Sequence, residues 1–204
     1  MDPLPVSLLV SALGGAVAAL FLRSIFRLIG KVWSERKPLA EYGCADSTKK
    51  RPALLVHGRG KRIDDPLSTN KRAWEHTPQA AEEDRVHTIY GPHVNDFGKP
   101  GYYRVSFRIY GSGFSNDATP VIILDVIQRP IFLRDNMIVV GQRIVRSKEL
   151  VPKYKGFDVY CYAAGSGTYE YRCQVIPESF DPKEHVLRFD VIQVYNHIPT
   201  WEVF

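Results

Sequence analysis

Residues 4–22 form an uninterrupted stretch without a charged side chain, and this stretch most constrains what the chain can fold into. About 20 apolar residues are enough to cross the hydrocarbon core of a bilayer as a helix. The stretch is apolar on every face, unlike the amphipathic helix that covers the core of a globular domain. We therefore predict one N-terminal transmembrane helix, which with a basic juxtamembrane extension occupies residues 1–33.

Basic residues gather on the C-terminal side of this stretch. Arg23, Arg27 and Lys31 recur every four residues, whereas Asp2 is the one charged side chain before it. Because positive flanks stay on the cytoplasmic side, the pattern predicts a single-pass protein with its N-terminus outside and its C-terminal domain in the cytoplasm. The basic side chains can reach lipid phosphates, so membrane lipid is a predicted partner.

A cleaved signal peptide is the alternative interpretation, and the protein would then be secreted. Residues 16–18 (AVA) resemble a cleavage site, but the segment before the apolar run contains Asp2 and no Lys or Arg. An uncleaved anchor fits this charge pattern better. Small residues that would let two anchor helices pack closely recur along the stretch, at Ser7, Ser11, Gly14, Gly15 and Ala18. A homodimer through the anchor helix and a protein partner therefore stay open.

The rest of the chain divides into a polar linker, residues 34–51, and one globular domain, residues 52–204. The three cysteines, Cys44, Cys161 and Cys173, are too few and too odd in number for a disulfide framework, which suits a reducing compartment. We interpret Cys161 and Cys173 as buried thiols that face each other in the core of the domain.

Short alternating runs replace helical periodicity from residue 52 onward. In residues 101–110 the apolar side chains at 103, 105, 107 and 109 alternate with polar ones at 104, 106 and 108, as in a half-buried strand. Further strands are predicted over 120–128, 137–145, 157–163, 169–176 and 185–195, with weaker candidates at 52–57, 72–76 and 85–90. We expect 157–163 and 169–176 to form a hairpin. This pattern predicts a mainly-β domain, a jelly-roll β-sandwich.

Several segments resemble the jelly-roll carbohydrate-binding modules and the wider group of galactose-binding-domain-like β-sandwiches. The resemblance covers roughly residues 52–204 and rests on 70–75 (NKRAWE), 89–93 (IYGPH), 101–109 (GYYRVSFRI), 123–126 (ILDV) and 187–192 (LRFDVI). Many of these modules begin with paired glutamates that help to hold a structural calcium, whereas residues 53–57 here are ALLVH. Asp190 alone is a poor calcium site, since calcium takes six to eight oxygen ligands. We predict no calcium, no other metal and no cofactor.

The resemblance implies a ligand site in which a sugar ring stacks on an aromatic side chain and polar groups hold its hydroxyls. The segment 195–201 (YNHIPTW) is the most suggestive, because it combines planar rings, an amide and an imidazole. The alternative is that Tyr195 and Trp201 close the core. The candidate ligand-binding residues are Trp74, Tyr90, His93, Asn95, Tyr195, Asn196, His197 and Trp201.

The sequence contains only weaker indications of a catalytic or metal site. The strand-like run 54–58 (LLVHG) resembles the start of an α/β-hydrolase, but the Gly-x-Ser-x-Gly elbow of those enzymes does not occur. The six histidines include no pair at the spacing that places two metal ligands on one face of an element. Asp125 and Asp190 lie within apolar strands, and we expect them to point outward or to bind backbone rather than to act as a catalytic pair.

These observations favour a membrane-anchored, non-catalytic binding module for a carbohydrate or glycan-like ligand. A metal-dependent enzyme on a β-sandwich and a structural subunit of a membrane complex are the alternatives. Nucleic acid is not a predicted partner: the net charge of +5 comes largely from the juxtamembrane region, and the domain shows no stripe of basic and aromatic residues.

Overall fold

The computed structural model describes residues 37–45, 56–78, 87–92, 94–129, 137–165 and 167–196. The predicted membrane helix lies outside these residues, as do His93, His197 and Trp201. Within the described ranges, no helix is both long and apolar enough to span a bilayer. The chain divides into two compact units, residues 1–37 and 38–204, and the second contains all the described strands.

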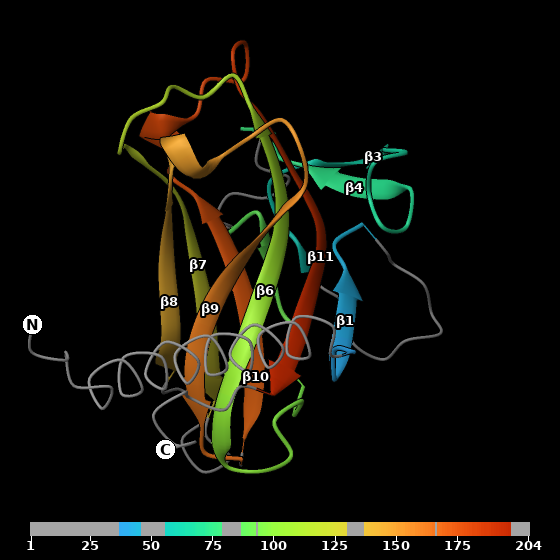
Figure 1. Ribbon diagram of the computed structural model, residues 1–204, viewed down its shortest axis with the longest axis vertical. Helices are drawn as coiled ribbons and strands as arrows, with labels where there is room; N and C mark the ends of the chain where they lie inside the picture. The colour runs from blue at the N-terminus through green and yellow to red at the C-terminus, as the bar shows by residue number, and fades with distance from the viewer. Residues whose placement is uncertain are drawn as a thin grey trace, which may run out of the picture. The chain divides into compact units, whose positions relative to one another are not determined.

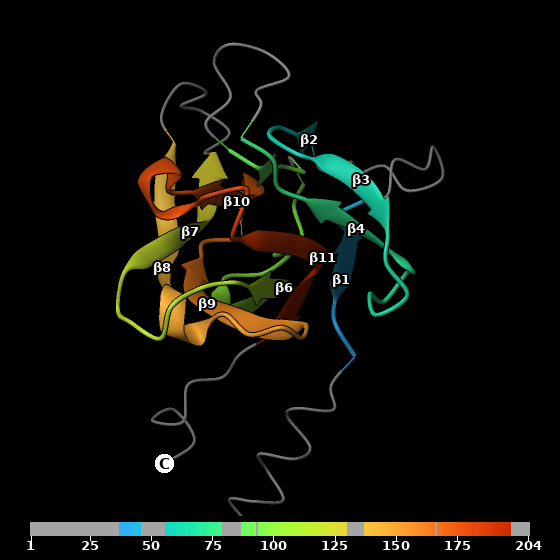
Figure 2. The same cartoon turned by 90° about the horizontal axis from the view of Figure 1, so that it is seen from above.

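The second unit is a β-sandwich of two antiparallel sheets, as the alternating runs predict (Figure 1; Figure 2). The six-stranded sheet has the order β3 (Lys61–Asp64), β4 (Arg72–Glu75), β11 (Val186–Asn196), β6 (Gly101–Ser112), β9 (Lys155–Ala163), with β1 (Ala40–Gly43) also paired to β11. The five-stranded sheet has the order β2 (Val56–His57), β5 (Ile89–Tyr90), β10 (Thr168–Val175), β7 (Pro120–Arg129), β8 (Ile138–Arg146). Two short 3₁₀ turns, Ser147–Glu149 and Pro177–Ser179, complete the described elements.

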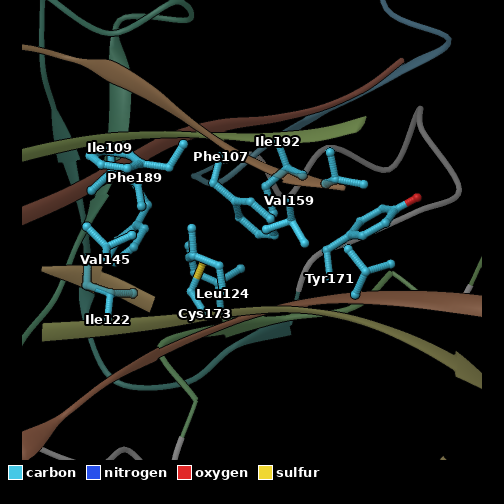
Figure 3. Close-up of a cluster of buried hydrophobic side chains, with 14 of the residues drawn as sticks. Phe107, Ile109, Ile122, Leu124, Val145, Val159, Tyr171, Cys173, Phe189 and Ile192 are labelled. Atoms are coloured by element: carbon cyan, nitrogen blue, oxygen red, sulfur yellow. The ribbon is translucent and has the colours of Figure 1, made fainter. Parts of the chain in front are cut away.

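The core lies between the two sheets and is built from alternate residues of the long strands. In β6 the buried positions are the predicted ones, among them Val105, Phe107 and Ile109. Figure 3 shows Phe107 and Phe189 of the six-stranded sheet facing Leu124 and Cys173 of the five-stranded sheet. Because side chains alternate along a strand, the residues between these buried positions must lie on the outer face of each sheet.

The predicted linker is not entirely a linker. Residues 40–43 form β1, which pairs with β11 in the register Ala40↔Val194 to Gly43↔Val191. Tyr42 anchors this strand, because its hydroxyl donates to the Asp96 carboxylate at 2.6 Å and the Tyr171 hydroxyl donates to the same carboxylate at 2.6 Å. Four residues are too few to show strand periodicity, and the partners of β1 are remote in the sequence. The local pattern therefore could not reveal it.

The predicted hairpin of 157–163 with 169–176 is wrong. Both segments are strands, but β9 pairs with β6, whereas β10 pairs with β5 and β7 in the opposite sheet. The glycine-rich connection has the composition of a hairpin turn, yet it carries the chain from one sheet to the other. Cys161 and Cys173 are nevertheless both buried free thiols of one core, as the sequence predicts, and they come from opposite sheets.

Asp125 and Asp190 do not point out into solvent. Asp125 is buried and pairs with Arg172 at 3.1 Å on the outer face of the five-stranded sheet, where Gln142 also donates to it at 2.9 Å. The Asp190 carboxylate is buried and accepts the backbone N–H of Thr69 at 3.0 Å, so its predicted backbone contact is present. The two acids lie in different sheets, and each is held by partners of its own.

Gly141 of β8 marks where the edges of the two sheets approach each other. A Cβ atom at this position would lie 2.8 Å from the Tyr160 carbonyl oxygen and 2.9 Å from Cys161 Cβ. We expect Gly141→Ala to lower the free energy of unfolding by about 1–3 kcal/mol, because β8 must move away from β9. Urea denaturation would measure this. Gly98→Ala is the matched control, since a Cβ there meets nothing within 4 Å. Equal effects of the two variants would contradict the close approach.

Candidate functional site

The outer face of the six-stranded sheet carries an array of aromatic and hydrogen-bonding side chains across β9, β6 and β11. Three neighbouring rows run across these strands. Tyr162 pairs with Tyr102 in the first, Arg104 lies between Tyr160 and Tyr195 in the second, and Ser106 lies between Asp158 and Gln193 in the third. We call this surface the tyrosine face; its members are Tyr102, Arg104, Ser106, Asp158, Tyr160, Tyr162, Gln193 and Tyr195. Each alternates with a buried core residue, so the sandwich itself orients the surface.

Two tyrosines of this face are strongly exposed. Tyr160 and Tyr162 lie on β9, an edge strand, and are 55% and 52% exposed. The ring of Tyr162 packs edge-on against Tyr102 with the ring centroids 5.1 Å apart. Because each of these rings stays more than half exposed, it can stack on the apolar face of a ligand ring. These rings are therefore the contact surface that the site offers.

Arg104 organises the centre of the tyrosine face. Its guanidinium carbon lies 4.3 Å from the centroid of the Tyr195 ring, within the range of a cation–π contact. One of its nitrogens also lies 3.7 Å from an Asp158 carboxylate oxygen, and both side chains are about three-quarters buried. Arg104 is thus held in place from two sides. A guanidinium fixed in this way presents several N–H donors in a planar fork.

A second chain of hydrogen bonds holds the β11 side of the face. The Tyr195 hydroxyl donates to Gln193 Oε1 at 2.9 Å, and Gln193 Nε2 donates to the Glu41 carboxylate of β1 at 2.7 Å. Burial raises the pKa of Tyr195, and the charge of Arg104 opposes that rise. The hydroxyl is therefore protonated at neutral pH and acts as the donor. β1, the strand that the sequence pattern did not reveal, thus supports a side chain of the site.

The loop between β3 and β4 borders the face at Arg108. Arg108 Nη1 donates to Thr69 Oγ1 at 2.6 Å and lies 3.3 Å from Asp190 Oδ2, so the loop is tied to the outer face of β6. Burial raises the pKa of Asp190, although its hydrogen bonds from Thr69 and the charge of Arg108 act against this. The Asp190 carboxylate therefore holds the loop in place through Thr69 and Arg108.

A second cluster fixes the other part of the same loop. The Tyr154 hydroxyl donates to Asp65 Oδ2 at 2.7 Å, and Arg188 bridges Asp65 at 3.2 Å and Glu75 at 3.0 Å. Burial opposes ionisation of Asp65, but the hydrogen bonds from Tyr154, the Leu67 backbone and Arg188 hold its pKa below the usual range. The loop is therefore preorganised, which reduces the conformational cost of any contact that it makes.

Among the predicted ligand residues that the structure describes, Tyr195 alone belongs to the tyrosine face, and the others lie elsewhere. Tyr195 belongs to the tyrosine face, while Asn196 ends β11, exposed and on the opposite side of the strand by alternation. Asn95 is exposed and follows Val94, which bridges to Tyr169 in the other sheet. Trp74 packs against the core and donates to the Arg59 carbonyl at 3.3 Å, and Tyr90 lies on β5 of the five-stranded sheet. His93, His197 and Trp201 lie outside the described residues.

Three tyrosines of the tyrosine face, two of them strongly exposed, were missed by sequence reasoning. Tyr102, Tyr160 and Tyr162 were not predicted as ligand residues, because they lie on the outward side of strands and the candidates came from loops. One signal was available: aromatic residues at positions that alternate with the core pattern of 101–110 and 157–163. The alternating pattern accounts for the apolar residues that face the core. It does not account for an aromatic ring on the solvent side of the same strand.

The described histidines and cysteines do not belong to a cluster of metal ligands. In the described part of the chain, no group of three or more His, Cys, Asp or Glu side chains could hold a metal ion. His87 is half-buried, and burial together with the Arg172 charge lowers its pKa. Burial raises the pKa of the Cys161 thiol to about 12, so this cysteine is not a ready nucleophile.

The burial of His76 predicts that the domain loses stability in acid. It is buried, its Nδ1 lies 2.9 Å from Thr88 Oγ1, and burial lowers its pKa from 6.5 to about 4. Because the folded pKa lies below the unfolded one, the unfolded chain takes up the proton first, and stability is lost as the pH falls through this window. We expect a loss of about 2 kcal/mol between about pH 7 and about pH 5. Urea denaturation at both pH values would show it.

The variant His76→Gln should remove most of this pH dependence, since glutamine does not titrate. His185→Gln is the matched control for loss of an imidazole and should leave the dependence in place. If His76→Gln showed the same acid loss as the wild type, another group would have to be responsible.

Comparison with known proteins found similarity to solved structures. No protein-family model matches the chain, and no curated protein sequence matches it. The chain is similar to the CBM22-1 and GH10 modules of a Clostridium thermocellum endo-1,4-beta-D-xylanase complexed with xylohexaose, with 10% identity and a TM-score of 0.49 over 79% of this chain. It spans 29% of that structure.

Two further matches cover nearly the whole of the other chain. One is the CBM22-1 xylan-binding domain from Paenibacillus barcinonensis, with 9% identity and a TM-score of 0.49 over 78% of this chain and 94% of that one. The other is a CBM6 module of a Cellvibrio mixtus lichenase in complex with cellotriose, with 8% identity and a TM-score of 0.44 over 80% of this chain and 100% of that one. All three structures contain carbohydrate-binding modules, the group that segments of this sequence resemble.

Proposed function

We propose that this protein is a non-catalytic binding module whose tyrosine face takes up a carbohydrate or glycan-like ligand. The observation that carries the proposal is the exposure of Tyr160 and Tyr162 beside the fixed donors and acceptors of Arg104, Asp158 and Gln193. A pyranose ring has one apolar face and a polar rim, so it needs an aromatic platform with hydrogen-bonding groups around it. The tyrosine face offers both.

We further propose that the module is held at a membrane by residues 4–22, with the β-sandwich on the cytoplasmic side. The uncharged stretch and the basic residues that follow it support this, by the rule that positive flanks remain in the cytoplasm. Protease protection on sealed vesicles is the test of the orientation. The domain should be digested from the cytoplasmic side alone, and digestion from the opposite side would reverse the topology.

A glycan array probed with the full chain in lipid nanodiscs tests the ligand class. We expect selective binding to a subset of glycans, and we expect Tyr160→Ala to weaken that binding by about 2 kcal/mol, because an aromatic contact at the centre of an interface is lost. Ile144→Ala, an exposed apolar residue of β8 in the other sheet, is the matched control and should bind like the wild type. No binding by the wild type to any glycan would refute the proposed ligand class.

A further inference from the structure

The loops at the end of the sandwich where β6 finishes line an open pocket of about 260 Å³. Its walls come from the β6–β7 connection, the turn after β8 and the segment between β10 and β11, which gather at the top of Figure 1. The tyrosine face does not contribute to it. The pocket wall includes aromatic, hydroxyl and acidic side chains, among them Phe114, Ser115, Ser147, Glu178, Asp181 and His185.

A stacked aromatic pair forms the apolar part of this pocket. The rings of Phe114 and His185 are nearly parallel, with an angle of 17° between them and their centroids 4.2 Å apart. The backbone N–H of Asp181 donates to His185 Nδ1 at 3.0 Å, which fixes the orientation of the imidazole. The pair is therefore a rigid aromatic wall, and the electron-rich face of a phenyl ring attracts a cation.

The charged groups in the pocket wall are all acidic. Glu178 and Asp181 line it, and no Lys or Arg does so among the residues that the structure describes. The hydroxyl-bearing Ser115 and Ser147 add neutral acceptors to the same wall. Carboxylates, hydroxyl oxygens and an aromatic face within one small pocket suit a ligand that carries a positive charge and several N–H donors on a compact apolar body.

We propose that this pocket binds a primary ammonium group borne on a small apolar or ring-shaped body. The ammonium would donate to Asp181 and Glu178 while the body lies against Phe114. An amino sugar and a lysine-like alkylamine share this chemistry. The site is separate from the tyrosine face and does not depend on the function proposed for that face.

Ring resonances of ¹³C-labelled histidine in the full chain, reconstituted in nanodiscs, provide a local readout. The His185 signal can be assigned by its loss in His185→Gln. We would titrate glucosamine, n-butylammonium and glucose at constant pH, glucose being the neutral counterpart of glucosamine. The His185 signal should shift saturably with one or both amines and not with glucose. Tighter binding of glucosamine would identify an amino sugar as the ligand, and tighter binding of n-butylammonium a lysine-like side chain.

Asp181→Asn should weaken binding of the amine by about tenfold or more, because a charge-assisted hydrogen bond is lost. Asparagine keeps an oxygen that can accept the Lys183 N–H, which Asp181 Oδ1 now accepts at 2.8 Å, so the turn is preserved. Glu184→Gln removes an exposed carboxylate outside the pocket wall and should have no effect. The proposal is overturned if no amine shifts the signal, if glucose shifts it as strongly, or if the two variants weaken binding equally.

Discussion

Replacing Tyr160 and Tyr162 together by alanine should raise the Kd for the glycan ligand about a thousandfold. Each ring is more than half exposed on β9, and each would lose an aromatic contact of about 2 kcal/mol with the ligand. Two such losses add to about 4 kcal/mol, which is three orders of magnitude in Kd. Titration calorimetry of the full chain with the best glycan from the array would measure the change.

The paired phenylalanine variant separates stacking from hydrogen bonding. Tyr160→Phe with Tyr162→Phe keeps both rings and removes both hydroxyls, so it should retain most of the affinity if stacking dominates. Because both side chains are exposed, neither pair of substitutions should alter the denaturation midpoint by much. A double alanine variant that is stable and still binds with unchanged Kd would rule out the tyrosine face as the site.

Arg172→Met should destabilise the domain by about 3–5 kcal/mol. Asp125 is buried on the outer face of the five-stranded sheet, and Arg172 is its charged partner at 3.1 Å. Removing the guanidinium leaves the carboxylate buried without a compensating charge, which costs far more than the pair itself contributes. The midpoint of urea denaturation at neutral pH would report the loss.

Two further variants test the reason for this effect. Removing both charges, with Asp125→Leu in addition to Arg172→Met, should restore much of the stability, because no unpaired charge then remains buried. Arg72→Met is the control for loss of a surface ion pair: its partner Asp64 is 94% exposed at a distance of 3.9 Å, and stability should hardly change. If the double variant were no more stable than Arg172→Met, the unpaired charge would not be the cause.

The correctly predicted strands include the short β4, but the prediction is clearest where a long strand is buried on one side only. β6 is the clearest example, because four apolar residues alternating with three polar ones over 103–109 identify both its existence and its inward face. β1 shows the opposite case: its residues become a strand through pairing with β11 and through the Tyr42–Asp96 contact, both of which connect remote parts of the chain.

The residues of the candidate site also differ in how far the sequence could predict their roles. Tyr195 could be named from its aromatic ring near a Pro-containing turn, but Arg104 and Gln193 acquire their roles from neighbours on other strands. Trp74 looked equally suitable in the sequence, yet its ring packs against the core. Nothing in the local sequence distinguishes a tyrosine on the solvent side of a sheet edge from a tryptophan that packs against the core.

The sequence by itself determined that the domain is a mainly-β sandwich, because strands such as β6 and β9 have apolar residues at every second position. Tertiary structure alone decided which strands are neighbours, as the separation of β9 from β10 demonstrates. Pairing depends on backbone hydrogen bonds that any residue can make, so it leaves little trace in residue identity. For that reason the tyrosine face, which is assembled from three strands, became visible when the strands were placed side by side.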